Sequence, residues 1–123
     1  MSTALLAIAL GGALGAMARF GVAHCVALVW PHLFPLGTLL INLLGSLVIG
    51  ILFGVWLKRP ELPTLLQQGV FIGFLGAFTT FSTFSLDTLR LLENGESLIA
   101  LGYVLLSVCL CLLATWAGLV LTR

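Results

Sequence analysis

The chain has 123 residues, of which 61% are hydrophobic and 7% are charged, and its formal net charge is +1. A soluble domain of this size cannot bury so much apolar surface, and the balanced charge excludes both a nucleic-acid-binding patch and an acidic tail. The composition therefore predicts an integral membrane protein with a single all-α membrane domain over residues 1–123.

Charged residues and prolines divide the sequence into four long apolar segments. Each is long enough to cross a bilayer as a helix, at about 1.5 Å of rise per residue. We predict transmembrane helices at residues 3–29, 36–57, 62–86 and 97–122. The N-terminus lacks the basic residues that open a cleavable signal peptide, so the first segment is interpreted as a membrane helix. Four helices place both termini on one side of the membrane.

The first segment carries one charged side chain, Arg19, in register with two glycines. Gly11, Gly15 and Arg19 recur at intervals of four, so they share one face of a helix. The glycines form a smooth groove in which another backbone can pack, with a cation at its end. An arginine in a membrane span normally faces protein or a water-filled vestibule; the alternative is that Arg19 extends to the membrane interface.

The second and fourth segments each carry a stripe of polar side chains at intervals of four. These are Thr38, Asn42 and Ser46 in the second segment, and Tyr103, Ser107, Cys111 and Thr115 in the fourth. Each stripe lies on one helix face, so the two could form the walls of a narrow polar path. The alternative for a single hydroxyl is an ordinary hydrogen bond between helices. Asn42 differs because its amide has four hydrogen-bonding positions to satisfy.

The third segment has no charge between residues 62 and 86, yet residues 73–85 are poor helix formers. The glycines and the threonine-rich run raise the free energy of a regular helix. We therefore predict two half-helices that meet near residues 76–80. Backbone groups freed by such a break are costly in hydrocarbon, so breaks usually line a cavity or hold an ion, as in transport proteins.

Basic residues are almost evenly divided between the two ends of the predicted helices. One end carries Lys58, Arg59 and Arg123, and the other carries Arg90 and, if it is interfacial, Arg19. The positive-inside rule orients a chain by this difference, which here is about one charge. Two alternatives follow: a chain that inserts both ways and forms an antiparallel two-fold dimer, and a single topology set by the basic turn.

The cysteines and histidines do not form a recognisable metal or catalytic pattern. Cys25, Cys109 and Cys111 stand in apolar runs, where a thiol behaves as a small hydrophobic group. Cys109 and Cys111 are two residues apart and so point to different helix faces. His24 and His32 have no carboxylate or cysteine at ligand spacing. We predict no catalytic residues and interpret the protein as a non-enzyme.

Three motifs stand in the first three segments: Gly11-Gly12-x-x-Gly15-Ala16-x-x-Arg19, Gly37-Thr38-x-x-x-Asn42-x-x-Gly45-Ser46, and Gly73-x-x-Gly76-Ala77-x-Thr79-Thr80-Phe81-Ser82-Thr83-Phe84. In this order they resemble the Fluc (CrcB) fluoride channel family. The resemblance implies a multi-pass channel of the bacterial inner membrane that exports cytoplasmic fluoride by passive flux and protects the cell from fluoride toxicity. It also implies an antiparallel dual-topology homodimer with two pores and a structural sodium ion (Na+) on the two-fold axis.

The resemblance further implies roles for particular residues. Those on the fluoride path are Asn42, Phe81 and Phe84, with a polar track of Ser82, Thr83, Tyr103 and Ser107. The implied sodium ligands are the backbone carbonyls of Gly76 and Thr79, and Arg19 has a vestibule or structural position. The chain departs from the family pattern at Phe20, Ala77 and Cys111, where the family commonly has a tyrosine, a glycine and a hydroxyl-bearing residue.

Such residues suit a small, strongly hydrated anion. Hydroxyl and amide groups replace its water without carrying full charge, and the edges of phenylalanine rings are the positive part of the ring quadrupole. Without the surrounding hydroxyls, Phe81 and Phe84 would be interpreted as ordinary apolar side chains that face lipid.

Two other functions remain as alternatives. A small dual-topology multidrug exporter has similar length, but proton coupling needs a carboxylate within the membrane. Here all four carboxylates, Glu61, Asp87, Glu93 and Glu96, are expected at segment ends. A non-transporting scaffold subunit would explain the glycine faces but not the broken third segment.

Overall fold

The computed structural model describes all 123 residues and is entirely helical. Its helices are α1 (Ser2–Val29), α2 (Leu36–Lys58), α3 (Thr64–Gln67), η1 (Gln68–Leu75), α4 (Gly76–Phe78), α5 (Phe81–Glu93) and α6 (Ser97–Thr122). Four segments are long and apolar enough to cross a membrane: α1, α2, the run from α3 to α5, and α6. The predicted all-α class with four membrane helices is confirmed.

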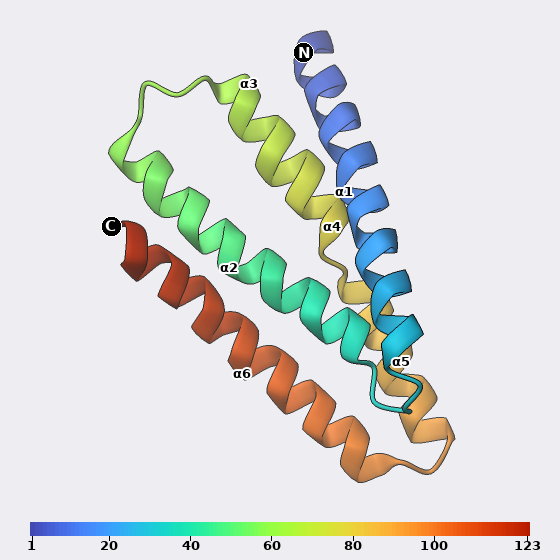
Figure 1. Ribbon diagram of the computed structural model, residues 1–123. Coiled ribbons are helices and arrows are strands. Elements are labelled where there is room, and N and C mark those ends of the chain that lie inside the picture. Colours follow the sequence, from blue (N-terminus) through green and yellow to red (C-terminus); the bar gives the residue numbers. More distant parts are fainter.

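The four segments run alternately up and down in Figure 1. The α1 helix lies along η1 and α4, and α2 lies along α6. The α1–α2 and α5–α6 connections lie together at the lower right of the view, whereas both termini and the α2–α3 connection lie toward the upper part. Both termini therefore lie at the same end of the bundle, as an even number of spans requires.

The third segment is broken where the threonines stand. α3, η1 and α4 are continuous, and η1 is π-helical, a form often found at functional sites. Thr79 and Thr80 then adopt extended backbone conformations, with ψ angles of 155° and 113°, before α5 begins at Phe81. The break thus lies within the predicted range of 76–80. α5 continues past residue 86 to Glu93, so the helix is longer than the sequence predicted.

Glycines allow both helix pairs to pack closely. A Cβ atom added at Gly11 would collide with the carbonyl oxygen of Gly69, and one added at Gly50 would collide with that of Thr115. Both sites therefore bring one backbone directly against another, which is the usual packing of small residues between membrane helices. The groove predicted on the first segment receives the π-helical part of the third.

The buried core is small and lies near the α5–α6 end. Leu39, Leu91, Ala100 and Tyr103 form it, and the Phe84 ring packs against it from α5. Most other large apolar side chains are exposed on the chain surface. Exposure of this kind is unfavourable in water but is expected for helices that meet lipid.

Candidate functional site

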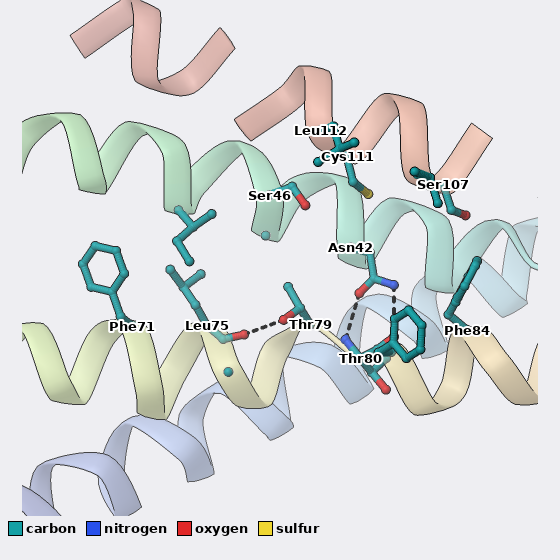
Figure 2. Close-up of a pocket in the computed structure, with 15 residues that line it drawn as sticks. Asn42, Ser46, Phe71, Leu75, Thr79, Thr80, Phe84, Ser107, Cys111 and Leu112 are labelled. Atoms are coloured by element: carbon teal, nitrogen blue, oxygen red, sulfur yellow. Dashed lines mark hydrogen bonds between the residues drawn. The ribbon is translucent and has the colours of Figure 1, made fainter. Parts of the chain in front are cut away.

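Asn42 bridges the break in the third segment. Its Nδ2 donates to the carbonyl oxygen of Thr80 at 3.1 Å, and the Thr80 N–H donates to Asn42 Oδ1 at 2.8 Å. Figure 2 shows the side chain descending from α2 to Thr80, with both bonds drawn. A break in hydrocarbon leaves backbone groups that must be satisfied by something other than the helix. The Asn42 amide thus satisfies both backbone polar groups of Thr80, its N–H and its carbonyl oxygen.

Two backbone carbonyls at the break lose their ordinary helical donors. The donor that a regular helix would supply to Gly76 is the Thr80 N–H, which is bonded to Asn42 instead. The donor for Thr79 would be the Thr83 N–H, which donates to Thr80 Oγ1 at 3.2 Å. The Thr79 carbonyl oxygen accepts no hydrogen bond in the structure. Both oxygens therefore have free coordination capacity.

A pocket of about 480 Å³ lies beside the break, between α2, the third segment and α6. It brings together six of the ten residues to which the family resemblance assigns a role: Asn42, Gly76, Thr79, Phe81, Phe84 and Ser107. Figure 2 shows Asn42 and Ser46 reaching into it from α2, opposite Thr79 and Thr80, with Ser107 and Cys111 from α6. Two members of each polar stripe, Asn42 and Ser46 of the second segment and Ser107 and Cys111 of the fourth, thus face the same space, with the break on its remaining side.

Three aromatic rings form a continuous row at the start of α5. The centroids of Phe81 and Phe84 are 5.4 Å apart with planes tilted by 48°, and those of Phe84 and Tyr103 are 5.2 Å apart with a 45° tilt. Phe81 is 79% exposed, whereas Tyr103 is fully buried. The row therefore runs from the open surface of the chain into its core.

Hydroxyl groups gather at the N-terminus of α5. Thr80 caps the helix, and its Oγ1 lies 3.1 Å from that of Thr83 and 3.4 Å from Ser82 Oγ. Ser82 and Thr83 do not line the first pocket. Thr83 instead lines a second cavity of about 300 Å³, together with Arg19, Thr38 and Thr80. The Nε atom of Arg19 is buried without a hydrogen-bond partner, so Arg19 faces protein rather than extending away from it.

Asp87 occupies a position that the sequence did not predict. It was expected beyond the end of the third segment, but it lies within α5 and is half-buried. Its Oδ2 accepts hydrogen bonds from Thr38 Oγ1 at 2.7 Å and from the Tyr103 hydroxyl at 3.2 Å. Asp87 thus lies inside α5 rather than just beyond the end of the third segment, next to the first turn of α2. Its spacing of four from Thr83 is the sequence signal that places it on the same helix face.

No cation pairs with this carboxylate, because the one ion pair in the chain joins Arg59 to Glu61. Asp87 therefore links α5 to α2 and α6 through neutral hydroxyls. Tyr103, predicted on the polar track, lies at this junction and outside the first pocket.

The polar stripe of α6 has different partners along its length. Thr115 Oγ1 donates to the carbonyl of Ser46 at 3.0 Å, a plain interhelical hydrogen bond. Ser107 is 6% exposed, and its Oγ has no partner. Cys111 lies between them and lines the first pocket. The stripe is thus partly structural and partly open to the cavity.

The model of the family described as CrcB-like protein, Camphor Resistance (CrcB), matches residues 6–119. A protein of Azotobacter vinelandii is 52% identical over 118 residues, covering 96% of this chain and 95% of its own. A protein of Pseudomonas syringae pv. tomato is 50% identical over 123 residues, covering 100% and 99%. A third, from Pseudomonas fluorescens, is 50% identical over 119 residues, covering 97% and 96%. All three are named fluoride-specific ion channel FluC.

Proposed function

The chain belongs to the CrcB-like family, and we propose that it is a fluoride-specific channel of the plasma membrane through which cytoplasmic fluoride leaves the cell by passive flux. Relatives that are about 50% identical over nearly their whole length carry that name. A channel is not an enzyme, and no chemical step is required of its residues. The multidrug-exporter alternative has no support from the relatives reported above, none of which carries an exporter's name.

The observation that carries the proposal is the pocket beside the break. It combines neutral donors from Asn42 and Ser107 with the rings of Phe81 and Phe84. A dehydrating anion needs donors that replace its water and yet release it, which neutral hydroxyl and amide groups provide. Ring edges add weak positive potential without forming a strong bond. The same lining contains no fixed cation, so an anion is not held in place.

We propose that the working unit is an antiparallel homodimer. Phe81 stands on the proposed path but is 79% exposed in one chain, so a single chain leaves part of the path without a wall. The nearly equal basic charge at the two ends permits insertion in both orientations. Adding two or three lysines to the loop between Trp30 and Leu36 should force one orientation and abolish flux. Co-expression with an oppositely biased copy should restore it, and full activity of a single-orientation population would contradict the dimer.

The carbonyls of Gly76 and Thr79 would hold a structural Na+ on the dimer axis. Their lost helical donors leave free lone pairs, and unwound backbone carbonyls are the usual Na+ ligands at broken membrane helices. A bound cation would supply positive potential that favours an anion nearby. The chain itself keeps both carbonyl oxygens free, because the Thr80 N–H donates to Asn42 and the Thr83 N–H donates to the Thr80 hydroxyl.

A flux measurement on purified protein in liposomes tests the function. Fluoride and chloride efflux are followed with ion-selective electrodes, with protein-free liposomes as the control for leakage. The proposal predicts rapid fluoride efflux and little chloride efflux. Equal efflux of both ions would contradict the selectivity, and proton-dependent uptake of an organic cation without fluoride efflux would support an exporter.

A further inference from the structure

We propose that Cys111 is a modification site on the channel path, at which polar thiol-directed reagents that form mixed disulfides attach and stop fluoride flux. The proposal rests on the proposed channel function for its effect on flux, but not for the accessibility of the thiol. Cys111 lies near the middle of α6 and lines the 480 Å³ pocket, one helical turn from Ser107. Figure 2 shows its sulfur directed from α6 toward the side on which Asn42 stands.

A second observation indicates that the pocket accepts water or small polar molecules. Ser107 lines the same pocket, is 6% exposed, and has a hydroxyl without any partner in the protein. A buried hydroxyl is unfavourable without a hydrogen bond, so water or a polar ligand is expected beside it. The same lining presents Asn42, Ser46 and Thr79. A small polar reagent dissolved in water can therefore reach the sulfur of Cys111.

The other two cysteines differ in position. Cys109 is two residues away, about 200° around the helix, and does not line the pocket. Cys25 belongs to α1 and also lies outside it. Both are exposed on the surface of the chain, within helices that are long and apolar enough to cross a membrane. A permanently charged reagent does not enter hydrocarbon, so the chain contains two internal controls.

The reagent chosen is a methanethiosulfonate that carries a trimethylammonium group. The Cys111 thiol loses its proton to water, and the thiolate attacks the sulfenyl sulfur of the reagent. A new S–S bond forms, the reagent's own S–S bond breaks, and methanesulfinate leaves with the bonding electron pair. The product places a cationic chain in the pocket, and excess dithiothreitol removes it by thiol–disulfide exchange.

The experiment uses the full chain in liposomes and two readouts. Intact mass counts adducts per chain, and fluoride efflux is compared with the same preparation before treatment. In the parent and in the variant Cys25→Ser/Cys109→Ser, we expect one adduct and a loss of flux of about tenfold or more, because the attached cationic chain occupies the pocket on the proposed ion path. Dithiothreitol should restore both the mass and the flux. In Cys111→Ser, neither should change on treatment.

Several results would overturn the proposal. They are a labelled Cys111 with undiminished flux, a Cys111 that reacts only after denaturation, and equal inhibition in Cys111→Ser. Should that variant fail to assemble, the Cys25→Ser/Cys109→Ser protein alone decides, because Cys111 is then its only thiol. A chain that is labelled at Cys111 but never conducts fluoride supports the access to the thiol and contradicts the channel function instead.

Discussion

Asn42 and Thr80 are paired as two peptide groups would be: the side-chain amide donates to one backbone carbonyl and accepts from the N–H of the same residue. The pair joins α2 to the point at which the third segment loses helical structure. It makes Asn42 both a pocket-lining group and the residue that stabilises the break. The two roles can be separated by substitution.

Asn42→Asp keeps an acceptor for the Thr80 N–H but removes the donor to its carbonyl. We expect a loss of about 1–3 kcal/mol in stability from the unsatisfied carbonyl, together with a fall in fluoride efflux because an ionised carboxylate repels the anion. Lowering the pH toward the carboxyl range should restore part of the flux, since the protonated form is neutral and donates again. Efflux at each pH is corrected with protein-free liposomes. Ser46→Ala, one turn along α2, is the matched control and should retain both stability and the parental pH profile.

Phe81→Ile and Phe84→Ile retain apolar bulk but remove the ring quadrupole. We expect fluoride efflux to fall sharply in both while the protein still purifies as the parent does. Phe84→Ile should also lower the free energy of unfolding by about 0.5–1.5 kcal/mol, because the Phe84 ring contacts Tyr103. Phe81→Ile should lower it less, because the Phe81 ring is mostly exposed. Phe53→Ile, on an exposed part of α2, should change neither property. Parental flux in both ring variants would mean that the ion travels elsewhere.

Asp87→Asn and Asp87→Leu distinguish the charge of Asp87 from its hydrogen bonds. Asparagine retains an acceptor for Thr38 and Tyr103, so its thermal unfolding should remain close to the parental value. Leucine leaves two hydroxyls without a partner, at about 1–3 kcal/mol each, and should be clearly less stable. Tyr103→Phe keeps the ring packing and removes one donor, so it should be intermediate. If asparagine and leucine destabilise equally, the charge rather than the acceptor holds the junction.

Gly50→Ala tests the contact between α2 and α6. Its Cβ would collide with the carbonyl of Thr115, so the helices must separate and stability should fall by about 1–3 kcal/mol. Gly21→Ala in α1 is the matched control, because nothing lies within 4 Å of its added Cβ. It should be neutral or slightly stabilising, since alanine favours a helix over glycine. Thermal unfolding in detergent measures both, and equal effects would contradict close packing at Gly50.

Substitutions at Gly76 test whether a second copy of the chain packs against this residue. The added Cβ would have only an ordinary contact of 3.6 Å, with the carbonyl of Phe71, so the chain itself has room for it. Alanine should therefore be tolerated, and a bulkier valine should disrupt assembly if a second copy packs there. Thr79→Ser should be mild, because the proposed Na+ ligand is a backbone oxygen. Anomalous scattering from a heavier monovalent ion would locate the site, and an empty dimer axis would remove the ion from the mechanism.

The amino-acid sequence alone determined the membrane class, the four helices and the position of the break. These depend on local properties: charge-free runs, helix propensity and the spacing of four that places Asn42 with Thr38 on one face. Local spacing does not tell which neighbouring helix a face will meet. Only the tertiary structure decided that the Asn42 amide bonds Thr80, which lies 38 positions away, and that Thr38 bonds Asp87, which lies 49 positions away. It likewise placed Cys111 with Ser107 beside the break, because three separately predicted segments meet there and no segment forms the pocket by itself.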